Sequence, residues 1–203
     1  MKENYQLITD SVISGLGGRR PRLLLHSCCG PCSSYVIEYL SRYFDLALLF
    51  YGPNIQPESE YEKRLYWQKR LLSEMPCAKG IELIPCEWRG EEFTSAVCGL
   101  EGEKEGGARC TVCFALRLEE TAKQAAALGF EYFCTTLSVS PHKDADRINR
   151  IGAALGEKYS VKWLPCDFKK RDGYKRSIEL AAQYGLYRQN YCGCLFSKPK
   201  QEQ

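Results

Sequence analysis

The stretch RLLLHSCCGPCSS, residues 22–34, decides the fold of this 203-residue chain. Its apolar residues 23–25 predict a buried strand, and helical spacing resumes after the cysteines. Pro31 suits the first turn of a helix, because its missing N–H has no helical partner to lose there. Gly30 allows a tight turn because it has no Cβ. The stretch therefore predicts a strand, a turn and a helix start, with three thiols at the turn: Cys28, Cys29 and Cys32.

Strands and helices are predicted to alternate along the rest of the chain. Apolar runs of strand length occur at 46–51, 80–86, 132–137 and 161–166. Helical patterns lie between them, including an amphipathic helix whose outer face carries Lys63, Arg64, Lys69 and Arg70, and helices that start at 109, 140 and 174. This alternation predicts an α/β fold, a Rossmann-like three-layer sandwich with a parallel sheet flanked by helices on both faces. Right-handed crossovers then bring every strand-to-helix loop to one edge.

Length and composition favour a single domain. We expect an N-terminal arm at 1–21, one α/β catalytic domain at 22–195 and a polar tail at 196–203, with residues 99–108 as a mobile loop. The sequence shows no membrane span and no signal peptide, so we expect a cytoplasmic protein with no membrane partner. A net charge of +3 permits an RNA partner but does not require one.

Twelve cysteines in a cytoplasmic chain favour metal binding or redox chemistry over disulfides. Two dithiol units on separate loops can supply the four thiolates of a structural zinc site or a [4Fe-4S] cluster. One unit is Cys28 and Cys29, and the other is Cys110 and Cys113. Adjacent cysteines form a poor zinc knuckle, whereas a cubane accepts ligands from more varied directions. The pattern therefore favours the cluster.

The C-terminal Cys192-Gly193-Cys194 is a different kind of motif. A disulfide across one glycine closes a very small ring, so it would be readily reduced, as expected of a catalytic pair. Two alternatives stay open, a pair of extra metal ligands and a simple turn. Cys32 is spare, and Cys86 and Cys166 are candidates for the same edge of the sheet.

Several motifs together resemble the cobalamin-independent epoxyqueuosine reductases of the QueH type. They are LLLHSCCGPC, YGPNIQPESEYEKR, RCTVCFALRL, TTLSVSPHKD, CDFKKRDGYKRS and YRQNYCGC, which extend from residue 23 to 194. The resemblance implies a fold similar to the HUP nucleotide-hydrolase-like group. It also implies the last step of queuosine synthesis, the two-electron removal of the epoxide oxygen of epoxyqueuosine in tRNA. One departure is Cys86-Glu87, where a tyrosine and an aspartate are expected.

Site residues are implied by the same resemblance. Cys28, Cys29, Cys110 and Cys113 are the implied ligands of a [4Fe-4S] cluster, and Cys192 with Cys194 the implied redox-active pair. A second, mononuclear metal ion such as iron is also implied, with Cys32, Glu87 and Asp167 as candidate ligands. The implied partners are tRNA carrying epoxyqueuosine in its anticodon loop and an electron donor that the sequence does not identify.

Two other functions remain as alternatives, a zinc-stabilised RNA-binding module without catalysis and an ATP-dependent nucleotide-hydrolase-like enzyme. In the reductase, a proton must reach the leaving oxygen, and the candidate acids are Tyr191, His142 and Asp167. Contacts to RNA phosphates are expected from basic side chains near the site. These are Arg147, Arg150, Lys169, Lys170, Arg171, Lys175, Arg176 and Arg188.

Overall fold

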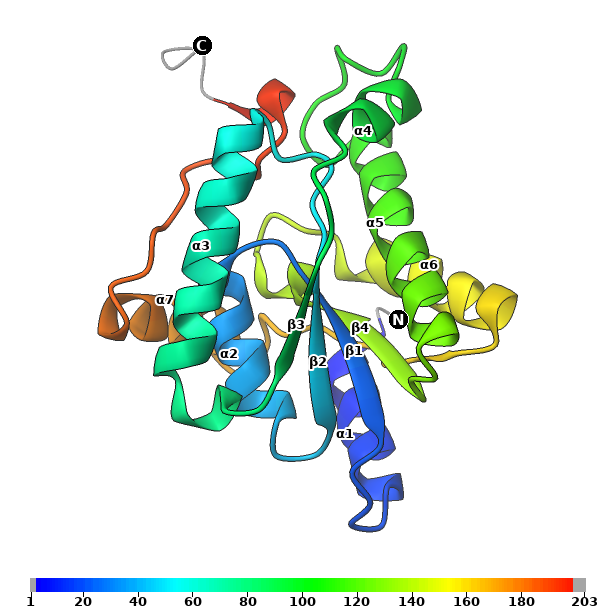
Figure 1. Ribbon diagram of the computed structural model, residues 1–203. Coiled ribbons are helices and arrows are strands. Elements are labelled where there is room, and N and C mark those ends of the chain that lie inside the picture. The colour runs from blue at the N-terminus through cyan, green and yellow to red at the C-terminus, as the bar shows by residue number, and fades with distance from the viewer. Residues whose placement is uncertain (1–2, 199–203) are drawn as a thin grey trace.

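The computed structural model describes residues 3–198, which contain a five-stranded parallel sheet in the order β3-β2-β1-β4-β5 (Figure 1). The strands are β1 Arg22–Ser27, β2 Asp45–Phe50, β3 Glu82–Pro85, β4 Tyr132–Thr135 and β5 Lys162–Trp163. The predicted parallel sheet is confirmed. Only β5 is much shorter than its apolar run, and it ends two residues before Pro165, which has no N–H to donate to a ladder.

Helices cover both faces of the sheet, which confirms the three-layer architecture. In Figure 1, α2 Gly30–Leu40, α3 Glu58–Glu74 and α7 Gly173–Gln183 lie on one side. The helices α5 Ala108–Ala127 and α6 Ala145–Tyr159 lie on the other side, with the short α4 Gly90–Ala96 beside α5. The central strands β1 and β2 are therefore covered on both faces, and five of the six residues in each are buried.

The N-terminal segment forms helix α1, Tyr5–Gly15, and packs on the domain. The Thr9 hydroxyl lies 2.6 Å from the Pro165 carbonyl, and the Tyr5 hydroxyl donates to Asp146 at 2.7 Å. At the other end of the chain, a short 3-10 helix at Leu195–Ser197 occupies the start of the expected tail. Residues 199–203 of that tail lie outside the described residues.

Two local predictions were wrong, and one short helix was missed. The helix expected from residue 140 begins at Ala145, where the Asp144 carboxylate caps it by accepting from the Arg147 amide at 3.2 Å. Helix α4 was not predicted, because its seven residues carry little apolar periodicity. Arg64 does not lie on an outer cationic face of α3 but is 1% exposed and paired with Glu60 at 2.7 Å.

No helix within residues 3–198 is both long enough and apolar enough to span a bilayer.

Candidate functional site

A cavity of about 380 Å³ opens at the carboxyl edge of the sheet, between the loops that follow β1 and β4. The strand order reverses here, since β2 and β3 lie on one side of β1 while β4 and β5 lie on the other. Open α/β sheets bind ligands at this reversal, because the two flanking loops diverge and leave a crevice. The sequence thus directs Cys28 and Cys29 to the position where the fold forms a pocket.

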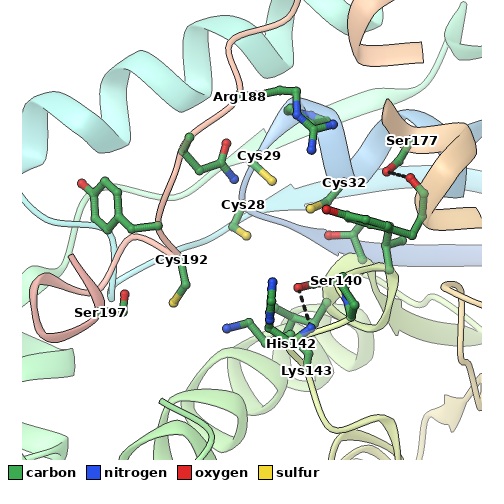
Figure 2. A pocket seen from close by; sticks show the side chains of 18 of the residues that line it. Cys28, Cys29, Cys32, Ser140, His142, Lys143, Ser177, Arg188, Cys192 and Ser197 are labelled. Carbon is green, nitrogen blue, oxygen red and sulfur yellow. Dashed lines mark hydrogen bonds between the residues drawn. The ribbon is translucent and has the colours of Figure 1, made fainter. Parts of the chain in front are cut away.

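Thiols from distant parts of the chain line this cavity. Figure 2 shows Cys28, Cys29 and Cys32 on one side and Cys192 across from Cys28, with His142 and Lys143 on a third side and Arg188 at the rim. The first three come from the turn before α2 and its first residues. The loop after β4 supplies His142 and Lys143, and the C-terminal segment supplies Cys192 and Arg188.

A second, narrow cavity adjoins the first and is lined by the other dithiol unit. Cys110 and Cys113, in the first turns of α5, face it together with Cys192 and Cys194. Both cavities share Cys192, Arg117, Lys143, Glu105 and Ser197. Cys192 therefore lies at the junction between the Cys28/Cys29 turn and the Cys110/Cys113 turn.

Several of these thiols have a raised pKa. A hydrogen bond with Cys29 and burial raise the pKa of Cys28 well above its ordinary value. Burial raises the pKa of Cys113 to about 12, although the nearby Arg117 acts in the opposite direction. All twelve cysteines lie within residues 3–198 and are free thiols in this structure.

The six predicted site cysteines all line one or both of these two cavities. Within residues 3–198, no three Cys, His, Asp or Glu side chains converge as the ligands of a single metal ion do. The thiols are instead distributed around connected spaces. The assignment of Cys28, Cys29, Cys110 and Cys113 as metal ligands stays a prediction.

Other candidates lie away from these thiols. Asp167 is paired with Lys169 at 2.6 Å and lines a third cavity beside α1, which adjoins the first at Pro141, His142 and Lys143. Glu87 lines neither cysteine cavity. Cys166 is completely buried and accepts from the Ser138 hydroxyl at 3.3 Å. Of the candidates for a second metal, only Cys32 lines the first cavity.

The candidate proton donors differ in placement. The Tyr191 hydroxyl donates to the Gln56 carbonyl at 2.9 Å, so its proton is already engaged. His142 lines the first cavity. Two cations at the site were not predicted, the buried Arg117 and Lys143, and Lys143 pairs with Glu105 at 2.8 Å. The position of Arg117, one turn after Cys113 on the same helix, is a signal that could have identified it.

Residues 23–200 match the protein family described as Epoxyqueuosine reductase QueH. The chain belongs to this family. A QueH relative from Streptococcus pyogenes is 43% identical over 184 residues, which span 90% of this chain and 72% of the relative. The QueH of Staphylococcus epidermidis is 43% identical, and the match covers 98% of this chain and 87% of the relative. The QueH of Thermotoga maritima is 37% identical, and the match covers 86% of this chain and 89% of the relative. All three carry the name Epoxyqueuosine reductase QueH.

The residues present fit the iron–sulfur group that the QueH resemblance implies. Thiolates are the donors that iron–sulfur clusters take, and the two cavities present Cys28, Cys29, Cys110 and Cys113. The buried guanidinium of Arg117 lies among them, with Nη1 4.0 Å from Cys113 Sγ. Its Nη2 has no hydrogen-bond partner within the described residues. Such a setting suits an anionic metal–thiolate group.

Proposed function

We propose that this QueH-family chain is an iron–sulfur epoxyqueuosine reductase that removes the epoxide oxygen of epoxyqueuosine in tRNA and leaves queuosine. The observation that carries the proposal is the meeting of Cys28, Cys29 and Cys32 with Cys192 around one cavity at the strand-order reversal. Cys28, Cys29, Cys110 and Cys113 would hold a [4Fe-4S] cluster. When bound, that cluster supplies single-electron transfer.

The reaction consumes two electrons and two protons, because the epoxide oxygen leaves as water and an alkene remains. Oxidation of Cys192 and Cys194 to a disulfide releases two electrons and two protons, which balances that requirement. Cys192 borders both cavities and Cys194 only the second, so the pair extends from the substrate cavity into the interior. An external donor must then reduce the disulfide before the next turnover.

Binding of the modified nucleotide is assigned to the first cavity. Unpaired bases of an RNA loop can turn outward into a protein pocket. His142 lines this cavity and would protonate the leaving oxygen, because the Tyr191 hydroxyl is engaged and Asp167 does not line this cavity. A second metal ion would take Cys32 among its ligands, since Glu87 and Asp167 line neither cysteine cavity.

Of the basic side chains expected to bind phosphates, Arg188 is the one that the site supports. It borders the first cavity and also an adjacent groove lined by Lys63. Five of the others are held in ion pairs with acidic side chains. They are Arg147, Arg150, Lys169, Arg171 and Arg176.

In the decisive experiment, anaerobically reconstituted protein is incubated with a strong reductant and with tRNA that carries epoxyqueuosine. The nucleosides of the tRNA are then identified by mass spectrometry. Queuosine is expected, from protein that absorbs near 400 nm and holds about four irons. Cys110→Ala should lose both colour and turnover, whereas Cys192→Ala should keep the colour and lose turnover.

The alternatives predict different results. Colourless protein with stoichiometric zinc and no queuosine would favour the zinc-stabilised RNA-binding module. Binding of ATP measured by calorimetry would favour the nucleotide-hydrolase-like enzyme. Normal turnover by Cys192→Ala would contradict the role given to the Cys192–Cys194 pair.

A further inference from the structure

Arg117 differs from the other buried cations of the described chain. Four cationic side chains are buried there: Arg64, Arg109, Arg117 and Lys143. Arg64 is paired with Glu60, and Lys143 with Glu105. Arg109 donates to the carbonyls of Leu100, Glu101 and Glu103. Arg117, 1% exposed, makes no such contact with an oxygen acceptor.

The neighbour of the Arg117 Nε atom does not neutralise its charge. Nε donates to His26 Nε2 at 3.3 Å, and that ring nitrogen also lies 2.9 Å from the Tyr51 carbonyl. Nδ1 of the same ring lies 2.8 Å from the Thr135 hydroxyl, which accepts from the Leu137 amide at 3.2 Å. An imidazole accepts such a hydrogen bond only in its neutral form, so His26 gives Arg117 a hydrogen-bond partner but no negative charge.

Only sulfur atoms remain as charge partners for Arg117. Its Nη1 lies 4.0 Å from Cys113 Sγ, and Cys28 and Cys192 line the first cavity together with it. A neutral thiol is a weak acceptor, so the guanidinium in the metal-free chain is a buried charge without a counter-ion. Metal ligation requires deprotonated cysteines, and it therefore supplies the missing negative charge.

We propose that Arg117 provides the buried positive charge that balances the thiolates of the metal-bound site and raises the potential at which that site accepts an electron. The inference rests on the proposed function, because it assumes the iron–sulfur group. Each electron taken up adds one negative charge next to the guanidinium, which stabilises the reduced form. Arg117 is thus a positioning residue that acts through the charge of the ligand shell.

Two measurements on three variants test this role. Arg117→Met removes the positive charge and Arg117→Lys keeps it. Arg109→Met, on the same helix, is the matched control. The first is thermal unfolding of the metal-free, reduced chain. Arg117→Met should raise Tm by about 2–4 °C, because an unpaired buried charge is replaced by an apolar chain. Arg109→Met should lower Tm, because it leaves buried carbonyls without donors.

The second measurement is the midpoint potential of the reconstituted proteins, titrated with dithionite and followed by electron paramagnetic resonance. Arg117→Met should shift the potential downward, and Arg117→Lys should stay close to the unsubstituted protein. Failure of Arg117→Met alone to hold the cluster would also support the proposal. An unchanged potential, or a metal-free Arg117→Met chain destabilised like Arg109→Met, would overturn it.

These outcomes are separable from failure of the proposed function. An unsubstituted chain that takes up no cluster would contradict the iron–sulfur reductase, and with it the effect on the potential. A chain that holds the cluster and makes queuosine, but shows the same potential with and without Arg117, would contradict only the role of this residue.

Discussion

At the scale of single residues, the C-terminal turn depends on Gly193. Its φ of +112° belongs to a region that favours glycine, and its carbonyl accepts from the Gln56 amide at 2.9 Å. A Cβ at this position would lie 3.0 Å from Ile55 Cγ1 and 3.1 Å from Arg64 Nη1. The glycine therefore allows the backbone between Cys192 and Cys194 to pass close to the loop after β2.

Gly193→Ala is expected to lower the free energy of unfolding by about 2–4 kcal/mol, because backbone strain and a close contact add together. It should also displace the two flanking thiols and reduce epoxyqueuosine turnover. Gly129→Ala is the matched control, since Gly129 has a φ of +68° and open space around the added Cβ. Urea unfolding of both variants checks this, and equal losses would contradict the packing argument.

At the scale of elements, helix α6 lies against β5 through glycines. A Cβ at Gly152 would lie 2.3 Å from the Trp163 ring, and Trp163 is fixed by a hydrogen bond from Nε1 to Asn149 Oδ1 at 3.0 Å. The indole therefore occupies the space that a side chain would need. Close packing here takes precedence over helix propensity, which by itself favours alanine.

Gly152→Ala should destabilise the protein by roughly 1–3 kcal/mol, because the clash with the Trp163 ring outweighs a propensity gain of about 1 kcal/mol. Gly15→Ala in α1 should have the opposite effect, since nothing lies within 4 Å of its added Cβ. Chemical denaturation of both variants measures the change in the free energy of unfolding, which should be a decrease for Gly152→Ala and an increase for Gly15→Ala. A stabilised Gly152→Ala would show that the indole can move at little cost.

Helices α2 and α7 are joined by a bidentate ion pair. Arg176 donates to both carboxylate oxygens of Glu38, at 2.6 and 2.9 Å. The hydrogen bond from Arg176 holds the pKa of Glu38 below its ordinary value. A carboxyl group with a lowered pKa in the folded state stabilises the fold at neutral pH, and that contribution is lost as the pH falls through the folded pKa.

Glu38→Gln is therefore expected to lower the free energy of unfolding by about 0.5–1 kcal/mol at pH 7, a modest value because solvent screens the pair. The difference from the unsubstituted chain should diminish as the pH falls through the lowered pKa of Glu38, because the ion pair is lost once that carboxyl is protonated. Unfolding curves from pH 3 to 7 measure it. Glu179→Gln, at the exposed side of the same arginine, should show a smaller difference.

At the scale of the whole molecule, the first cavity and the adjacent groove form one continuous surface around Arg188. The groove is also lined by Pro57, Ser59 and Lys63 near the start of α3. A nucleotide in the first cavity would place its neighbouring phosphates toward this groove. Phosphate contacts make binding sensitive to salt, because each neutralised phosphate releases counterions.

Arg188→Ala should weaken binding of tRNA and reduce the slope of log K against log salt concentration by about one. Arg171→Ala serves as the control, because Arg171 is paired with Asp10 on α1. The affinity of both variants for tRNA, measured at several salt concentrations, tests whether Arg188 contacts a phosphate. Equal slopes for Arg188→Ala and the unsubstituted chain would remove Arg188 from the contact surface.

Much of the architecture was predictable from the sequence. The strand–turn–helix at 22–34, the parallel sheet and the edge that carries the cysteines follow from local patterns and from the handedness of crossovers. These features are local or topological, so they need no knowledge of which side chains meet. The same reasoning predicted that the Cys28/Cys29 motif and the Cys110/Cys113 motif lie at a common edge before any distance was known.

Only the tertiary structure decided which side chains share the interior of the site. Arg64 and Arg117 follow helical patterns that suit solvent or core equally well, yet both are buried, one under the C-terminal turn and the other among the thiols. The side-chain pattern along one helix does not specify what the facing segment contributes. Long-range packing brings residue 192 to residues 28 and 113, and that packing sets the charge balance of the site.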